Sequence, residues 1–148
     1  MSLPAPHPAE PGFSAIRDAA SRIAAEARRT PLLESPLLNA RLGGRLLVKA
    51  EPLQRTGSFK FRGAFNRISR LDADEREDRE EIGRRICAER GSILVPPYDD
   101  PHVIAGQGTV GLEMAEQARE MGVRLDAVAA CASGGGLVAG IALAMEHE

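Results

Sequence analysis

The sequence predicts an α/β fold in which short strands alternate with helices. Two apolar runs, residues 45–49 and 126–131, are bounded by glycine, proline or polar residues in the manner of buried strands. Around them, longer segments repeat apolar residues every three or four positions, which is typical of helices. Elements that alternate in this way usually form parallel strands flanked by helices. The chain has 148 residues, 43% of them hydrophobic, which suffices for one such domain.

The N-terminal third is predicted to contain a leader, a helix and a strand. Residues 1–12 are rich in proline and predict a disordered leader, which leaves residues 13–148 as a single domain. A helix should follow from Ser14 and end before Thr30, because a residue that precedes proline disfavours the helical conformation. The first strand is expected at residues 45–49.

The middle of the chain is predicted to hold a helix, an acidic stretch and a short strand. The helix should begin at Ser58 and carry four apolar side chains on one face, namely Phe61, Ala64, Phe65 and Ile68. Residues 72–81 contain seven acids and two arginines, a charge run that usually forms a solvated helix face or a linker. Residues 93–95 should form a short strand that ends at Pro96.

The C-terminal third is predicted to hold two helices with a strand between them. The first helix should begin at either Val103 or Thr109 and end at Met121, where a following glycine can cap it. The strand at residues 126–131 should lead through a glycine-rich loop into an apolar helix over residues 137–145.

Composition excludes several classes of function. The chain has 19 Lys and Arg against 21 Asp and Glu and only 3% aromatic residues, so it lacks the basic surface and the stacking side chains of nucleic-acid-binding proteins. Its two cysteines and three histidines show no metal-ligand spacing, so we expect no metal site. Without an apolar run of membrane-spanning length, we expect a cytoplasmic protein with no membrane or nucleic-acid partner.

The most chemically suggestive segment is the loop Ser133-Gly134-Gly135-Gly136. Successive glycines let backbone N–H groups approach a ligand, and the start of the following helix favours an anion such as phosphate. A tight turn without a ligand is the alternative. Residues 134–139 also match the loose dinucleotide fingerprint, and residues 106–111 match the strict one. A nucleotide-binding module therefore stays open as a further hypothesis.

Lys60 lies at a predicted helix start, between two phenylalanines. Lys49 and Lys60 are the only lysines of the chain, although a bias toward arginine explains this equally well for Lys49. Partial burial and the helix N-terminus would both disfavour the ammonium form of Lys60, so that its neutral amine can react with a carbonyl group. Together, this lysine and a phosphate-binding loop indicate pyridoxal 5′-phosphate, with the aldehyde at Lys60 and the phosphate at the loop.

Three segments of the chain resemble a known family. Residues 49–66 closely resemble the cofactor-lysine segment of the threonine/serine dehydratases, which belong with serine racemase to the fold-type II pyridoxal-phosphate enzymes. Residues 101–109 and 131–140 resemble the family's segments before and at its glycine loop. The resemblance implies a tryptophan synthase beta-like fold, of which this chain would hold a part. We also expect a homo-oligomer.

The resemblance also implies a site and a reaction. Lys60 would hold pyridoxal 5′-phosphate as a Schiff base and take the α-proton of the substrate, and Phe59 would pack against the cofactor ring. The phosphate would be bound by backbone N–H groups of Ser133, Gly134, Gly135, Gly136 and Leu137. The implied reaction is β-elimination of a hydroxy amino acid, L-threonine or L-serine, to a 2-oxo acid and ammonia. Racemase activity and a catalytically inactive fragment are the alternatives.

The chain also departs from the family's pattern. Only 73 positions separate Lys60 from Ser133, and the Ser-Ser-Gly-Asn-His-type loop that binds the substrate carboxylate in the family is absent between them. We therefore expect an abridged domain with a deletion junction near residues 72–81. C-terminal residues that contact the pyridine nitrogen are also expected to be missing. Apolar surface should consequently be uncovered near Val128, Leu137, Ile141 and Leu143.

Overall fold

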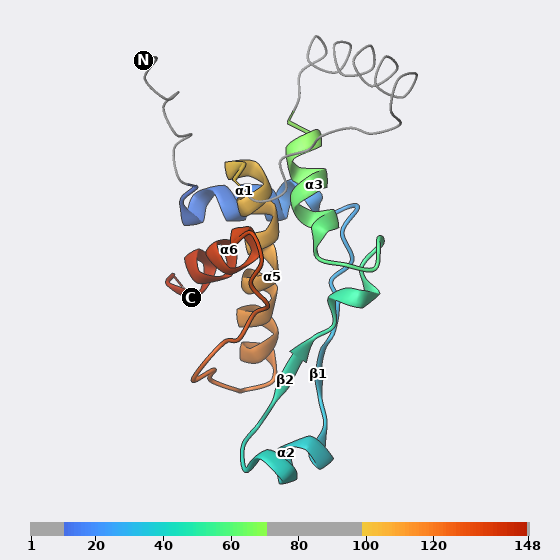
Figure 1. The fold of residues 1–148 in the computed structure, drawn as a ribbon, viewed down its shortest axis with the longest axis vertical. Coiled ribbons are helices and arrows are strands. Elements are labelled where there is room, and N and C mark those ends of the chain that lie inside the picture. The colour runs from blue at the N-terminus through green and yellow to red at the C-terminus, as the bar shows by residue number, and fades with distance from the viewer. Residues whose placement is uncertain (1–10, 71–98, 148) are drawn as a thin grey trace.

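The computed structural model describes residues 11–70 and 99–147 (Figure 1). Two short strands, β1 (Leu32–Glu34) and β2 (Leu47–Lys49), lie in the N-terminal half. The helical elements are α1 (Phe13–Ile23), α2 (Pro36–Leu42), the 3-10 turn η1 (Glu51–Leu53), α3 (Lys60–Ile68), α5 (Pro101–Glu120) and α6 (Gly136–Met145). Three predicted segments lie outside the described residues: the acidic run at residues 72–81, the strand at residues 93–95 and all but the last two residues of the leader.

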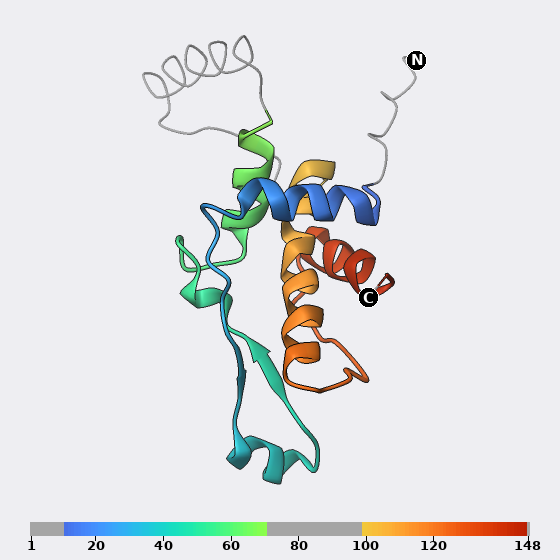
Figure 2. The ribbon, with the colours of Figure 1, turned by 180° about the vertical axis from the view of Figure 1, so that it is seen from behind.

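Helix α5 is the centre of the fold. Helices α1, α3 and α6 all pack against it, as the two opposite views in Figures 1 and 2 show. Two residues fix where α5 begins. Pro101 lies in its first turn, and the Asp100 side chain accepts hydrogen bonds from the N–H groups of His102 and Val103. Gly122, with φ +66°, follows its last turn and ends it as predicted.

Glycines bring the helices around α5 unusually close to it. A Cβ on Gly106 would lie 2.5 Å from the carbonyl oxygen of Arg62 in α3, and a Cβ on Gly140 in α6 would lie 2.6 Å from the nitrogen of Gly108. These contacts explain the glycines at residues 106–111 by packing. The segment lies inside a helix rather than between a strand and a helix, so its match to the dinucleotide fingerprint has no structural basis.

The strand prediction needs two corrections. Strands β1 and β2 pair antiparallel, with Leu33 opposite Val48, whereas we expected parallel strands. The connection through α2, residues 35–46, reverses the direction of the chain, so that β2 returns beside β1 and pairs with it antiparallel. Residues 126–131 are not a strand, because no described segment runs beside them to share backbone hydrogen bonds.

Helix α3 buries the face opposite to its apolar one. Its buried residues are Arg62, Gly63 and Asn66, while Phe61 and Phe65 are half-buried and stack on each other with ring centroids 5.6 Å apart. The polar face turns inward because its side chains find partners there. Asn66, for example, donates to the carbonyl of His102 and accepts from the Arg22 guanidinium.

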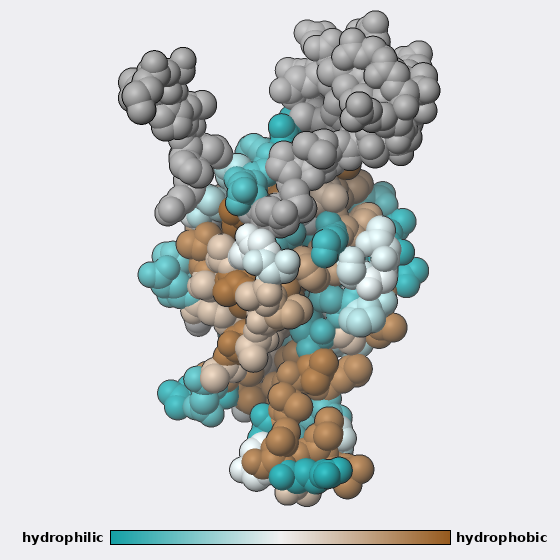
Figure 3. All heavy atoms as spheres, in the orientation of Figure 1, coloured by the Kyte–Doolittle hydropathy of each residue, from teal (hydrophilic) through white to brown (hydrophobic). Residues whose placement is uncertain are grey.

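Exposed apolar side chains gather on the hairpin that extends away from the helices. The hairpin runs from β1 through α2 to β2 and carries Leu33, Leu37, Leu38, Leu42, Leu46 and Val48, all at least 40% exposed. Figure 3 shows brown side chains at this end of the molecule. Ile141, which we expected to be uncovered, is instead 6% exposed because α6 packs against α5. Among the described residues, no helix has the length and apolarity needed to cross a membrane.

Candidate functional site

Lys60 is the first residue of α3, and its side chain is exposed. Its Nζ lies over the ring of Phe59, 4.7 Å from the ring centroid, and makes no hydrogen bond or ion pair with any described residue. The expected partial burial of Lys60 is therefore wrong: Arg62 and Gly63 of the same helical turn are buried, whereas Lys60 lies on its exposed side. The amine is accessible to a ligand.

The glycine loop leads directly into α6. Ser133, Gly134 and Gly135 are exposed, and Gly135 has φ +88°, a conformation that residues with a Cβ rarely adopt. Helix α6 starts at Gly136, and no side chain caps it. Because the first N–H groups of a helix have no partner within the helix, those at the start of α6 are free to bind an anion.

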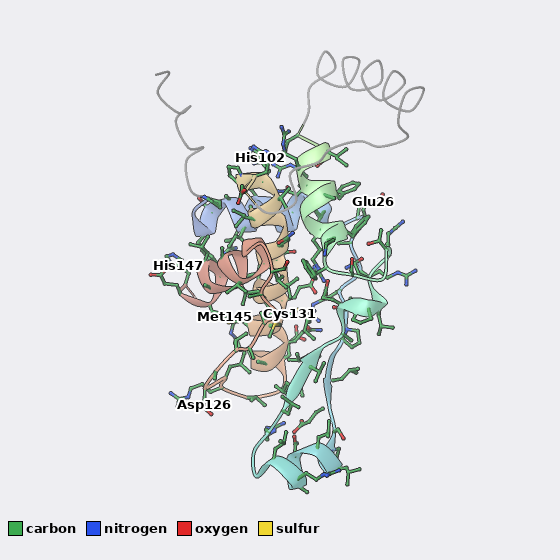
Figure 4. All side chains as sticks on the ribbon, in the orientation of Figure 1. Glu26, His102, Asp126, Cys131, Met145 and His147 are labelled. Carbon is green, nitrogen blue, oxygen red and sulfur yellow. The ribbon has the colours of Figure 1, made fainter. Side chains whose placement is uncertain are left out.

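Lys60 and the glycine loop line one cavity. It has a volume of about 250 Å³ and is lined by Phe59, Lys60, Gln107 and the segment 131–138. Every residue that the sequence indicated for the site is among them: Phe59, Lys60, Ser133, Gly134, Gly135, Gly136 and Leu137. The fold thus joins two segments that lie 73 positions apart in the sequence. Cys131, labelled in Figure 4, belongs to the segment that leads into the loop, and its free thiol is exposed.

Gln107 is a cavity residue that the sequence did not single out. It lies on α5, is 4% exposed, and its carboxamide makes no hydrogen bond within the described part of the chain. Its position in the segment 101–109, which resembles the family, was the one available signal. Since no side-chain polar atom of the described residues is both sealed from solvent and without a hydrogen bond, this carboxamide reaches the cavity, where a ligand could bond to it.

A buried ion cluster lies beneath Lys60. Arg62, fully buried, donates to both oxygens of Glu51 over 2.8 and 2.9 Å and to both oxygens of Glu113 over 2.7 and 2.9 Å. Lys49, with 4% of its side chain exposed, also binds Glu113 and donates to the Thr30 carbonyl over 2.7 Å. The cluster connects η1, α3, α5 and β2 and so fixes the start of α3, which carries Lys60.

In this cluster, burial and the neighbouring carboxylates shift the pKa of Lys49 and of Arg62 in opposite directions. Burial lowers the pKa of Lys49, and its hydrogen bond to Glu113 offsets only part of that effect. Burial would also lower the pKa of Arg62, but its hydrogen bonds to Glu51 and Glu113 outweigh burial and raise that pKa. Lys49 is therefore a member of a closed structural network rather than a second reactive amine.

A larger cavity, of about 610 Å³, lies elsewhere. It is formed by the end of α5, the segment 123–130 and α6, and small or apolar side chains make up most of its wall. Neither Lys60 nor the glycine loop borders it. Since it brings together no reactive amine and no anion-binding backbone, the smaller cavity is the candidate functional site despite its size.

The arrangement of the smaller cavity fits a small ligand with two different ends. One wall offers the accessible amine of Lys60, which can bond to an electrophilic carbon. The other wall offers the free N–H groups of the loop and of the α6 start, which suit a phosphate or another oxyanion.

The chain is also similar to known proteins in sequence. The sequence model of a family described as "Pyridoxal-phosphate dependent enzyme" matches residues 23–80 and 72–148. An L-threo-3-hydroxyaspartate ammonia-lyase of Saccharomyces cerevisiae is 34% identical over 191 residues, which include 90% of this chain and 57% of that protein. A serine racemase of Arabidopsis thaliana is 32% identical over 87% of this chain and 55% of its own length.

A solved structure is also similar. The crystal structure of a threonine deaminase from T.th. has a TM-score of 0.79 and 42% identity, with 93% of this chain and 57% of that chain covered. The chain therefore spans a little over half the length of the relatives that it matches. The region aligned with the yeast protein is longer than this entire chain, so that relative has residues within the aligned region that have no counterpart here.

Proposed function

Because the chain belongs to the family of pyridoxal-phosphate-dependent enzymes, whose fold-type II members it resembles in structure, we propose that its site binds pyridoxal 5′-phosphate between Lys60 and the glycine loop. The activity we propose is that of an ammonia-lyase, the β-elimination of a hydroxy amino acid. The observation that carries the proposal is the single cavity lined both by Lys60 and by residues 133–137.

The residues of the cavity fit this cofactor. The Lys60 amine, without a hydrogen-bond partner among the described residues, would hold the aldehyde carbon. Backbone N–H groups of the loop and of the α6 start would hold the phosphate, and Gly135 gives that loop its left-handed turn. Phe59, beside the lysine, would contact the ring. Once bound, the cofactor supplies an electron sink for the charge left by a departing α-proton.

Once the amine of the substrate has replaced it at the aldehyde carbon, the freed Lys60 Nζ is also the group that would take this proton. It is the basic side-chain atom among the described lining residues, none of which is a carboxylate or a histidine that could replace it. We propose substrates with a hydroxyl at the β-carbon, L-threonine or L-serine. Support comes from the names of the relatives: a hydroxyaspartate ammonia-lyase, a threonine deaminase and a serine racemase.

A second candidate, an abridged and catalytically inactive member, is supported by the alignments. The family model matches the chain in two parts that meet at residues 72–80, within the acidic run. We propose that a segment of the family's domain is missing at this junction. The site residues described above lie on either side of this junction. The chain could therefore bind the cofactor and still lack catalytic activity.

The test of cofactor binding uses the small number of lysines. The purified chain is incubated with pyridoxal 5′-phosphate, reduced with borohydride and digested, and the modified peptide is identified by mass. We expect one adduct, at Lys60, that is absent from Lys60→Ala and retained in Lys49→Arg, because Lys49 is buried in its ion cluster. A folded wild-type chain without an adduct at Lys60 would overturn the proposal, and so would equal labelling of Lys60→Ala.

A further inference from the structure

Gln107 differs from the other buried glutamines of the described chain. The Gln54 carboxamide accepts a hydrogen bond from the Arg28 N–H and donates one to the Arg28 carbonyl, both over 2.9 Å. Gln117 accepts from Lys49 and donates to the Thr30 carbonyl over 3.0 Å. Gln107 is 4% exposed, yet its carboxamide has no partner among the described residues. This carboxamide therefore lines the cavity with hydrogen-bonding capacity that the described chain does not use, which points to a ligand.

The surroundings of Gln107 direct its carboxamide into the cavity. On either side along α5, Gly106 packs against α3 and Gly108 packs against α6, so Gln107 lies between these two helices. Its Cγ would be 3.1 Å from a Cβ on Gly63, which shows that the side-chain stem lies against α3. In the described part of the chain, no side-chain polar atom is sealed from solvent without a hydrogen bond. The carboxamide therefore opens to the cavity that Lys60 and the glycine loop also line.

The charge of the cavity favours an anion near this carboxamide. Both α3 and α6 begin at the cavity, at Lys60 and Gly136, and helix N-termini carry partial positive charge. No acidic side chain is among the described lining residues. A glutamine carboxamide next to an anion presents its NH₂ group, because that is its donor end.

We propose that the Gln107 carboxamide donates a hydrogen bond to the phosphate group of the bound cofactor and so completes a phosphate site otherwise built from backbone N–H groups. The proposal rests on the proposed function, since it takes the phosphate of pyridoxal 5′-phosphate as the anion. Gln107 is therefore a residue that selects the phosphorylated form of the cofactor over pyridoxal, which has the same ring and aldehyde but no phosphate.

The test compares these two aldehydes on matched variants. Dissociation constants for pyridoxal 5′-phosphate and for pyridoxal are measured by absorbance titration on the wild type, Gln107→Leu, Gln107→Glu and Gln117→Leu. We expect Gln107→Leu to weaken binding of the phosphorylated form about tenfold and to leave pyridoxal binding unchanged, since a hydrogen bond to a charged group is lost. Gln107→Glu should lose more, because its carboxylate repels the phosphate.

Thermal unfolding without ligand separates this role from a structural one. Gln107→Leu should unfold at the same temperature as the wild type or higher, because no hydrogen bond within the described chain is lost. Gln117→Leu should unfold at a lower temperature, since it loses bonds to Lys49 and Thr30, but it should keep the wild-type preference for the phosphorylated cofactor.

Three outcomes would overturn the proposal. One is an equal loss of affinity for both aldehydes in Gln107→Leu and Gln107→Glu. Another is unchanged affinity for pyridoxal 5′-phosphate combined with weaker binding of an amino-acid substrate, which would assign Gln107 to the substrate carboxylate. The third is a wild-type chain that forms no Lys60 adduct at all, which would show that the proposed function itself has failed.

Discussion

Gly140 of α6 and Gly108 of α5 touch backbone to backbone: a Cβ on Gly140 would lie 2.6 Å from the Gly108 nitrogen and 2.6 Å from the Ile104 carbonyl oxygen. This contact sets how deeply α6 seats against α5. Since the glycine loop is continuous with the start of α6, and Gln107 precedes Gly108, the same contact sets the distance between the loop and Gln107.

Replacing Gly140 by alanine should therefore disturb both stability and binding. The backbone atoms that the new methyl meets have no room to move aside, so α6 must shift, at a cost of about 1–3 kcal/mol in the free energy of unfolding. We expect weaker binding of pyridoxal 5′-phosphate as well. Gly44→Ala is the matched control, because nothing lies within 4 Å of its Cβ and its φ is not positive. Equal unfolding free energies for the two variants would contradict this account.

The buried ion cluster should respond strongly to the loss of one carboxylate. In Glu113→Gln, Arg62 and Lys49 together keep one uncompensated positive charge, which should lower the free energy of unfolding by about 3–5 kcal/mol. Adding Lys49→Met should recover part of this loss, since the charges balance again. Urea unfolding of both variants tests this. Arg29→Gln, which breaks an exposed pair with Glu120, should cost less than about 1 kcal/mol.

The hairpin should weaken in acid through Glu34. Hydrogen bonds from Arg45 and then Asn39 lower the pKa of Glu34 to about 2 from 4.5. Because the folded pKa is the lower one, the stabilisation is complete above pH 4.5 and is lost as the pH falls toward 2. Nuclear magnetic resonance of the hairpin amides across this range should show the loss in the wild type and little change in Glu34→Gln. The same pH dependence in both would assign the transition to another group.

Local sequence patterns predicted the end of α5 and both ends of α6 well. Gly122 after α5 and the glycines before α6 are signals that act within a few residues, whereas α5 begins at Pro101, before either predicted start, Val103 or Thr109. The sharing of one cavity by Lys60 and the glycine loop was also predicted, from a resemblance that spans both segments.

Properties that depend on distant partners were not predictable in this way. The buried face of α3 is polar because Arg62 pairs with Glu51 and Glu113. Both carboxylates lie outside α3, so the spacing of apolar residues within α3 could not indicate them. The antiparallel pairing of β1 and β2 depends on the reversal between them. Gln107 stands out only because its carboxamide lacks a partner in the described chain, which is a property of the folded state.

The exposed leucines of the hairpin should promote self-association. Leu37 and Leu42, at the two ends of α2, are 72% and 64% exposed, and apolar side chains grouped on a protruding element favour contact between copies. The double variant Leu37→Glu with Leu42→Glu should sediment as a smaller species than the wild type at equal concentration. Arg41→Glu, on the same helix, changes charge without removing apolar surface and should leave the sedimentation unchanged. No difference among the three proteins would contradict this expectation.

Catalysis should be much weaker in this chain than cofactor binding. The sequence between Lys60 and Ser133 contains no Ser-Ser-Gly-Asn-His-type loop, the segment expected to bind the carboxylate of a hydroxy amino acid. Correct orientation of reacting groups contributes several kcal/mol to barrier reduction, and about 4 kcal/mol corresponds to about a thousandfold in rate. We therefore expect 2-oxobutanoate formation from L-threonine far below the typical enzyme rate of about 10 s⁻¹, even where the Lys60 adduct forms. Turnover near that rate, abolished in Lys60→Ala, would show that a loop of this type is dispensable for catalysis.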